Sequence, residues 1–182
     1  MRRPDLAAIL LVGLATSAIA DGIEVPFDNG AACMEGPTAQ FGRYVGNWDI
    51  QDWQLDQDGQ TWNEGQGARW NFACLGSGTA IQDFWLPPDG NVGTNLRTYN
   101  AETETWDIIW IINMLPGFSH ITAKMDDDGD IVMEYVSPIP DPLRRITFFP
   151  PDDTGWDWKL EFSSDAGESW TEVYRIRATP AK

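Results

Sequence analysis

The sequence predicts an all-β fold, a single antiparallel up-and-down barrel of about ten strands. Three observations predict it. Turn signals built from Asp and Gly recur along the chain, at 58–59, 76–78, 89–90, 128–129, 153–155 and 165–167. The runs between them are rich in Trp, Tyr, Phe, Ile and Val, which favour strands. Several runs also alternate apolar with polar residues, as a strand with one buried face does.

The intervals between turns give the candidate strands in order. They are 42–54, 60–73, 79–86, 92–99, 105–113, 118–125, 130–137, 143–149, 155–163 and 168–178. In the ninth, Trp156, Trp158 and Leu160 alternate with charged residues. Gly and Pro recur too often for a long helix, and only 38–44 retains some helical character. Because closing the sheet removes its edges, we expect a barrel, with a β-sandwich as the runner-up.

The candidate strand at 105–113 departs from alternation. Residues 108–112 read Ile-Ile-Trp-Ile-Ile and are apolar on both faces. The outer face of this strand therefore needs a cover. The N-terminal segment, the proline-rich loop at 138–142 and another subunit are the three candidates.

The N-terminus has the features of a secretory signal peptide. Two arginines precede a short apolar stretch, and Ala18-Ile19-Ala20 provides small residues for cleavage before Asp21. We expect residues 1–20 to be this signal peptide, 21–40 an irregular segment and 41–182 the barrel domain. The apolar stretch is shorter than the roughly 20 residues needed to span a bilayer, so no stable membrane insertion is expected after cleavage. The mature protein is predicted to be periplasmic or secreted.

The chain is strongly acidic, with a formal net charge of −16 and a sequence pI near 4.1. Such a surface repels nucleic acids and anionic membranes, which excludes them as expected partners. The sequence contains two cysteines, Cys33 and Cys74. In an oxidising compartment they predict a disulfide that ties the irregular segment to the barrel, and a pair of buried free thiols is the alternative.

Two motifs point to a known superfamily. The first strand carries Gly46-Asn47-Trp48, and the last ends in Tyr174-Arg175-Ile176-Arg177. Together with the hairpin meander between them, these resemble the calycin barrels, which include lipocalins, fatty-acid-binding proteins and nitrobindin-like domains. The pattern Trp-x-x-x-x-Ser-x-Asp-x-Gly-x-x-Trp, from Trp158 to Trp170, resembles exported bacterial relatives of this group. The resemblance implies that Trp48 lies at the closed end of the barrel, with Arg175 or Arg177 packed over it.

Motifs that suggest chemistry fail on spacing or number. Residues 163–170 match an Asp-box, but a propeller needs several copies and the sequence has one. The acidic turns at 56–59 and 126–130 lack the first and twelfth ligands of an EF-hand. His120 is the single histidine, which argues against a catalytic triad or a multi-histidine zinc site. No metal or cofactor is predicted, although haem bound through His120 remains an alternative, because nitrobindin-like barrels bind haem through one histidine.

The sequence therefore predicts an exported barrel that binds a small hydrophobic or aromatic ligand in its interior. The candidate lining residues are Trp70, Trp85, Trp110, Tyr135 and Trp158, with His120 as a polar anchor. One alternative is a metal-free isomerase or cyclase of the calycin barrel class, for which Glu64 and Asp83 are candidate carboxylates. Another is an envelope or glycan interaction module, and a homodimer through the 108–112 strand fits that reading.

Overall fold

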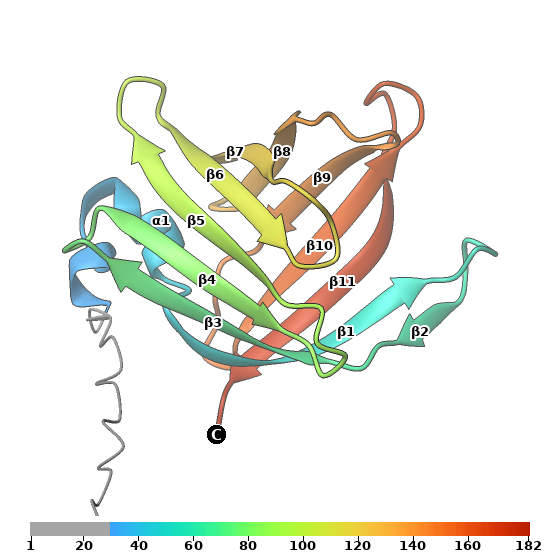
Figure 1. Cartoon of the computed structure of the whole chain (residues 1–182), viewed down its shortest axis with the longest axis horizontal. Helices are drawn as coiled ribbons and strands as arrows, with labels where there is room; N and C mark the ends of the chain where they lie inside the picture. Colours follow the sequence, from blue (N-terminus) through green and yellow to red (C-terminus); the bar gives the residue numbers. More distant parts are fainter. Residues whose placement is uncertain (1–29) are drawn as a thin grey trace, which may run out of the picture.

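The computed structural model describes residues 30–182, which form one closed antiparallel sheet (Figure 1). The strands are β1 (Gly46–Leu55), β2 (Trp62–Glu64), β3 (Ala68–Leu75), β4 (Ala80–Leu86), β5 (Gly93–Asn100), β6 (Thr105–Ile112), β7 (Ser119–Met125), β8 (Ile131–Ser137), β9 (Leu143–Phe148), β10 (Trp156–Ser163) and β11 (Thr171–Pro180). The predicted signal peptide at 1–20 lies outside the described residues.

Hairpins connect the strands in sequence order, and the last strand returns to the first. β11 pairs with β1 from Trp48↔Pro180 to Gln54↔Tyr174. Within residues 30–182 the result is a closed up-and-down barrel of ten strands with one extra strand, β2, beside β1. The predicted barrel is confirmed, and the sandwich is wrong because the sheet has no second layer to pack against.

The extra strand arises because the candidate strand at 60–73 is interrupted. β1 pairs with β3 through residues 46–50 and with β2 through residues 53–55. Between the two, the chain bends around Asp52, whose Oδ1 accepts the N–H of Gly67 at 2.8 Å. A Cβ at Gly65 would collide with the same carboxylate. The β1–β2 hairpin consequently projects from the barrel (Figure 1).

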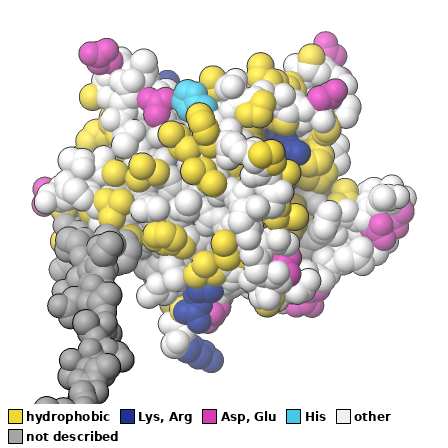
Figure 2. Space-filling model, viewed as in Figure 1, with side chains coloured by type: hydrophobic (Ala, Val, Ile, Leu, Met, Phe, Trp, Pro, Cys, Tyr) yellow, Lys and Arg dark blue, Asp and Glu magenta, His cyan; other side chains and the backbone are white. Residues whose placement is uncertain are grey.

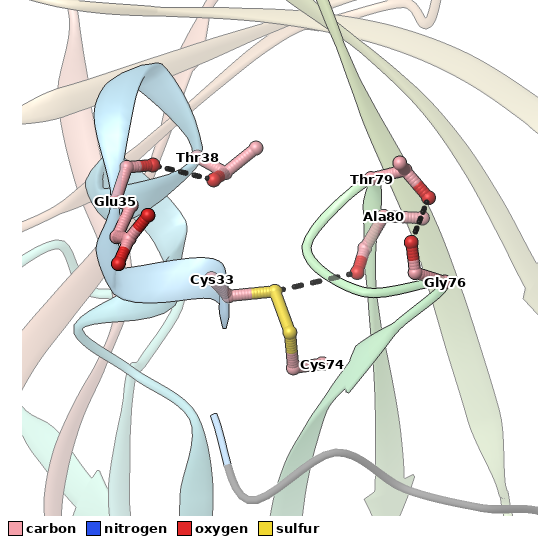
Figure 3. The surroundings of a disulfide bond; sticks show 7 residues. All are labelled: Cys33, Glu35, Thr38, Cys74, Gly76, Thr79 and Ala80. Atoms are coloured by element: carbon pink, nitrogen blue, oxygen red, sulfur yellow. Dashed lines mark hydrogen bonds between the residues drawn. A yellow bond between two sulfur atoms is a disulfide. The ribbon is translucent and has the colours of Figure 1, made fainter. Parts of the chain in front are cut away.

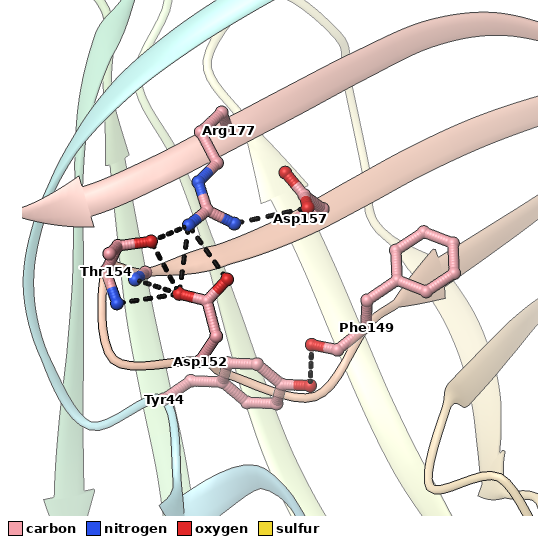
Figure 4. A network of polar contacts seen from close by, with 7 residues as sticks. Tyr44, Phe149, Asp152, Thr154, Asp157 and Arg177 are labelled. Carbon is pink, nitrogen blue, oxygen red and sulfur yellow. Dashed lines mark hydrogen bonds and ion pairs between the residues drawn. The ribbon is translucent and has the colours of Figure 1, made fainter.

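Short helices precede the first strand and cover one end of the barrel. They are η1 (Ala31–Met34), η2 (Gly36–Thr38) and α1 (Ala39–Gly42), so the weak helical character at 38–44 is real. Phe41 and Tyr44 are fully buried there against Trp106, Phe148 and other aromatic rings. The Tyr44 hydroxyl donates to the carbonyl of Phe149 at 2.9 Å (Figure 4). This end of the barrel is closed by packed aromatic side chains.

The disulfide between Cys33 and Cys74 fastens the helical segment to β3 (Figure 3). Both cysteines are fully buried. Figure 3 shows η1 on one side of the bond and the β3–β4 turn, from Gly76 to Thr79, on the other. The predicted pairing is confirmed, and it joins two parts of the core rather than a loose tail to a surface.

The two arginines of the last strand differ from the arrangement that the calycin resemblance implies. The Arg177 guanidinium donates to both oxygens of Asp152 and to Asp157, and it also contacts Thr154 (Figure 4). Arg175 lies over the ring of Trp62, with its Cζ 3.9 Å from the ring centroid. Trp48 instead donates from Nε1 to the Tyr44 carbonyl and packs against Trp156. Alternation along β11 turns both arginines outward, which is why neither covers Trp48.

The outer face of β6 is apolar and partly open. Ile109 is 42% exposed and Ile111 is 47% exposed, and exposed apolar side chains also gather on neighbouring elements (Figure 2). The expected cover over the 108–112 strand is therefore incomplete within residues 30–182. Among the helices within residues 30–182, none is long and apolar enough to cross a membrane.

Candidate ligand cavity

The barrel encloses a cavity of about 290 Å³ on the inner side of the sheet. Fourteen side chains from nine strands border it: Trp70, Trp85, Asn95, Arg97, Trp110, Ile121, Met133, Tyr135, Ile146, Phe148, Trp158, Leu160, Tyr174 and Ile176. Five of these strands, β5 and β8 to β11, contribute two residues each, and these are two positions apart because strand residues alternate between faces. The lining is mostly apolar, and seven of its members are aromatic.

The structure brings five of the six candidate lining residues together. Trp70, Trp85, Trp110, Tyr135 and Trp158 all border this cavity, from β3, β4, β6, β8 and β10. Their use by a ligand remains a prediction. The alternation of apolar and polar residues along each strand predicted that these side chains face the interior.

His120 lies on the outer surface and is not a cavity residue. Its neighbour Ile121 borders the cavity, so alternation along β7 turns His120 outward. There Nε2 lies 3.1 Å from Asp107 Oδ1 on β6. The prediction of His120 as an interior polar anchor is wrong, and the haem alternative loses its interior ligand.

Aromatic rings in edge-to-face contact form the wall. Trp70 meets Trp85 at a centroid separation of 5.3 Å and Trp158 at 6.2 Å, and Trp158 meets Tyr174 at 5.9 Å. Trp110 crosses the start of β5, where a Cβ at Gly93 would collide with its ring. These contacts hold large flat surfaces in fixed orientations, which suits a flat apolar molecule.

A charged pair lies at the floor of the cavity. Asp83 on β4 and Arg97 on β5 are both completely buried, and the Arg97 Nη1 forms an ion pair with Asp83 Oδ2. Asn95 donates from Nδ2 to both Asp83 oxygens at 3.1 Å. Sequence reasoning missed Asn95 and Arg97. In the run Asn95-Leu96-Arg97, the apolar residue is the natural choice for the interior, yet Leu96 is the exposed one.

Two tyrosines bring hydroxyl groups to the cavity wall. The Tyr174 hydroxyl donates to Asp52 Oδ2 at 2.6 Å, and burial together with this carboxylate raises the pKa of Tyr174. Burial also raises the pKa of Tyr135. Both groups therefore stay protonated at neutral pH, and neither is a base in that range. The Tyr174 proton is already donated to Asp52, which leaves the Tyr135 hydroxyl as the tyrosine that can donate to a ligand.

The two candidate carboxylates for acid–base chemistry, Glu64 and Asp83, lie in different parts of the molecule. Asp83 is buried at the floor of the cavity in its ion pair with Arg97. Glu64 is exposed on β2, where its Oε1 accepts from Gln51 Nε2 at 2.9 Å. They do not form a pair across a common site.

The acidic turns use their carboxylates to bind the turn backbone. Asp126 Oδ1 accepts the N–H groups of Asp128 and Asp130, and Asp58 Oδ1 accepts those of Gln60 and Thr61. In the Asp-box, Asp165 Oδ1 accepts the N–H of Ser169. These side chains act as hairpin turn residues.

Comparisons with known proteins add a fold relationship. No protein-family model and no curated protein sequence matches this chain. Among solved structures, the S-type phycobiliprotein lyase CPES from Guillardia theta matches with a TM-score of 0.54 and 11% sequence identity. The match covers 83% of this chain and 96% of the lyase. The described part of this protein, a ten-stranded antiparallel barrel with one extra strand, is thus similar in fold to that lyase.

Proposed function

We propose that this protein binds a small hydrophobic or aromatic molecule inside the barrel. The observation that carries the proposal is the cavity of about 290 Å³ with its wall of aromatic side chains. This volume lies near the lower end of the range of ligand sites, about 300–1,000 Å³. The barrel interior is thus not completely filled by its own side chains, as it would be if the fold served only to display an outer surface.

The energetics of the cavity support this reading. Placing an apolar ligand there removes its surface and that of the aromatic wall from water, at about 25 cal/mol per Å² of apolar area. The rings are already oriented by contacts with one another, so little side-chain freedom is lost on binding. Affinity then depends on the wall residues more than on the rim.

Substitution of the wall tests the proposal. In separate variants, Trp110→Ala and Trp158→Ala should abolish the fluorescence enhancement that the purified protein gives with N-phenyl-1-naphthylamine, a neutral apolar probe. Trp62→Ala is the matched control, because Trp62 lies on β2 under Arg175 and not on the cavity wall. Circular dichroism should show an intact β-sheet in all three. Unchanged probe binding in both wall variants would refute the assignment of the cavity as the binding site.

A linear tetrapyrrole is a second candidate, favoured by the likeness to a phycobiliprotein lyase. Such a molecule is flat, conjugated and apolar along most of its length. It is also larger than the cavity, so one part would lie inside and the remainder at the rim. Titration with biliverdin, followed by its visible absorption and circular dichroism, tests this candidate. An induced signal that Trp158→Ala removes supports it, whereas no spectral change would eliminate tetrapyrroles and leave smaller ligands.

A further inference from the structure

The cavity is bordered by buried hydrogen-bond donors that lack acceptors. Arg97 is 0% exposed, and its Nη1 is in direct contact with Asp83 in the ion pair, whereas Nε and Nη2 have no acceptor among residues 30–182. The indole Nε1 atoms of Trp70 and Trp158 are also buried, and they too have no hydrogen-bond acceptor among residues 30–182. All three side chains border the one cavity. An unsatisfied buried donor costs about 1–3 kcal/mol. Three side chains with such donors beside one cavity therefore indicate that a hydrogen-bond acceptor binds there.

Arg97 lies between aromatic rings and the cavity. The guanidinium carbon lies 4.8 Å from the ring centroid of Phe41, 5.3 Å from that of Phe72 and 5.9 Å from that of Phe148. Aromatic rings stabilise the charge of the guanidinium but supply no oxygen acceptor to its N–H groups. Because Arg97 itself borders the cavity, an acceptor for these groups can come from a molecule bound there.

The charges around the cavity decide which acceptor fits. The positive charge of Arg97 is balanced by Asp83 in the ion pair. Arg97 is the one cationic side chain among the residues that border the cavity, whereas Arg144 lies beside Tyr135, with its Cζ 5.9 Å from that ring, and the Asp52 carboxylate lies directly behind Tyr174. A ligand carboxylate placed at Arg97 would therefore meet a guanidinium whose charge Asp83 already balances, which makes burial of the carboxylate there unfavourable. A neutral oxygen would accept the N–H groups without that cost.

We propose that the interior ligand of this barrel is a flat, apolar molecule with an uncharged carbonyl oxygen, such as a ketone, quinone or lactam, that accepts hydrogen bonds from Arg97. This inference rests on the proposed function and specifies its ligand class. The aromatic wall supplies the affinity for the rings, and Arg97 supplies the orientation, with the oxygen toward the floor. The Nε1 groups of Trp70 and Trp158 are further donors for the same oxygen or for a second one.

Three probes with the same ring system test this ligand class: fluorene, 9-fluorenone and fluorene-9-carboxylate. Their binding to the purified protein is measured at neutral pH by quenching of tryptophan fluorescence and by calorimetry. We expect fluorenone to bind at least about tenfold more tightly than fluorene, because a hydrogen bond to a charged donor is worth about 1.5–3 kcal/mol. The carboxylate should bind more weakly than both.

The double variant Asp83→Asn with Arg97→Met removes the donor without leaving either charge buried alone. It should lose the preference for fluorenone, so that fluorene and fluorenone bind to the variant with affinities within about twofold of each other. If the double variant does not fold, the infrared carbonyl stretch of fluorenone bound to the wild-type protein provides the test. A shift to lower frequency than in hydrocarbon solvent indicates a hydrogen bond, and an unshifted band refutes the inference.

The outcomes separate this inference from the function on which it rests. Equal binding of fluorene and fluorenone would overturn the carbonyl assignment and would indicate water as the partner of Arg97. The proposed function, binding of an apolar molecule in the cavity, would still stand. Tightest binding of the carboxylate would overturn the choice of a neutral acceptor. If no probe binds, the proposed function fails, and the carbonyl assignment fails with it.

Discussion

At the scale of single residues, the interior depends on a few buried polar contacts within an aromatic core. Asp52, at the point where β2 and β3 separate, receives the Tyr174 hydroxyl and the Gly67 N–H. Asp83 receives Arg97 and Asn95 in the same way. Each carboxylate is paired inside the barrel, as buried charges must be. The stability of the wall therefore depends on hydroxyl and amide groups as well as on rings.

Replacing Tyr174 with Phe removes one of these bonds while keeping the ring. We expect the free energy of unfolding to fall by about 1–3 kcal/mol, because one oxygen of the Asp52 carboxylate loses its donor. Urea denaturation followed by circular dichroism measures this change. Tyr99→Phe is the matched control, since Tyr99 contacts Trp106 through its ring and its hydroxyl is not one of the hydrogen-bonded groups described above. Equal losses in the two variants would contradict the role assigned to the Asp52 contact.

Tyr44 gives the protein a specific response to alkaline pH. Burial raises the pKa of Tyr44 to about 12, whereas an unfolded tyrosine has a pKa of about 10. Between these values the unfolded state has already lost the proton that the folded state keeps. The stabilisation is thus complete below about pH 10 and falls by up to about 1.4 kcal/mol per pH unit above it. Unfolding free energies measured from pH 8 to 11.5 should show this decline, and a shallower one in Tyr44→Phe.

At the scale of strands, the turn residues and the alternating pattern predicted most of the sheet. The limits of β4 to β10 differ from the expected ones by at most one residue, because Asp-Gly turns end strands clearly. The break between β2 and β3 was not predicted, since its cause is the distant carboxylate of Asp52. Likewise, in β5 the interior position of Arg97 follows from Asp83 on the adjacent strand. Contacts between strands decide these features, and no single run of sequence contains them.

Gly93 tests how the strands position the cavity wall. Because its Cβ would collide with the Trp110 ring, Gly93→Ala should displace that ring. We expect about tenfold weaker binding of N-phenyl-1-naphthylamine, as overpacking typically costs 1–3 kcal/mol. In Gly90→Ala, the added Cβ would meet no atom within 4 Å; the φ of +81° makes the substitution strained, but the strain lies in the turn and not against the Trp110 ring, so the affinity should be unchanged. Equal affinity in both variants would show that Trp110 does not need its present position.

At the scale of the whole molecule, the helical cap and the barrel form one core. The cap contributes Cys33, Phe41 and Tyr44 to the buried cluster, and the disulfide connects it to β3. The sequence predicted this bond from the number of cysteines and from the predicted signal peptide. It did not predict that the cap closes one end of the barrel, because residues 30–45 carry no strong pattern of their own.

Loss of the disulfide should lower stability substantially. The bond joins positions 41 residues apart, and the chain-entropy model gives about 4 kcal/mol for a loop of this size. We expect the variant with both Cys33→Ser and Cys74→Ser to unfold at a clearly lower urea concentration than the wild type. A reducing agent should lower the midpoint of the wild type and leave the variant unaffected. If the midpoints of wild type and variant coincide, the cap does not depend on the bond.

Closure of the barrel by β1 and β11 also sets the order in which the fold can be completed. The strand that closes the sheet, Thr171–Pro180, is synthesised after the other strands, and its partner Gly46–Leu55 is synthesised before them. Until β11 is made, β1 and β10 each present an open edge that can pair with another chain. Contacts between such distant segments also form slowly. The barrel therefore stays open, with two edges accessible to other chains, until β11 has been synthesised.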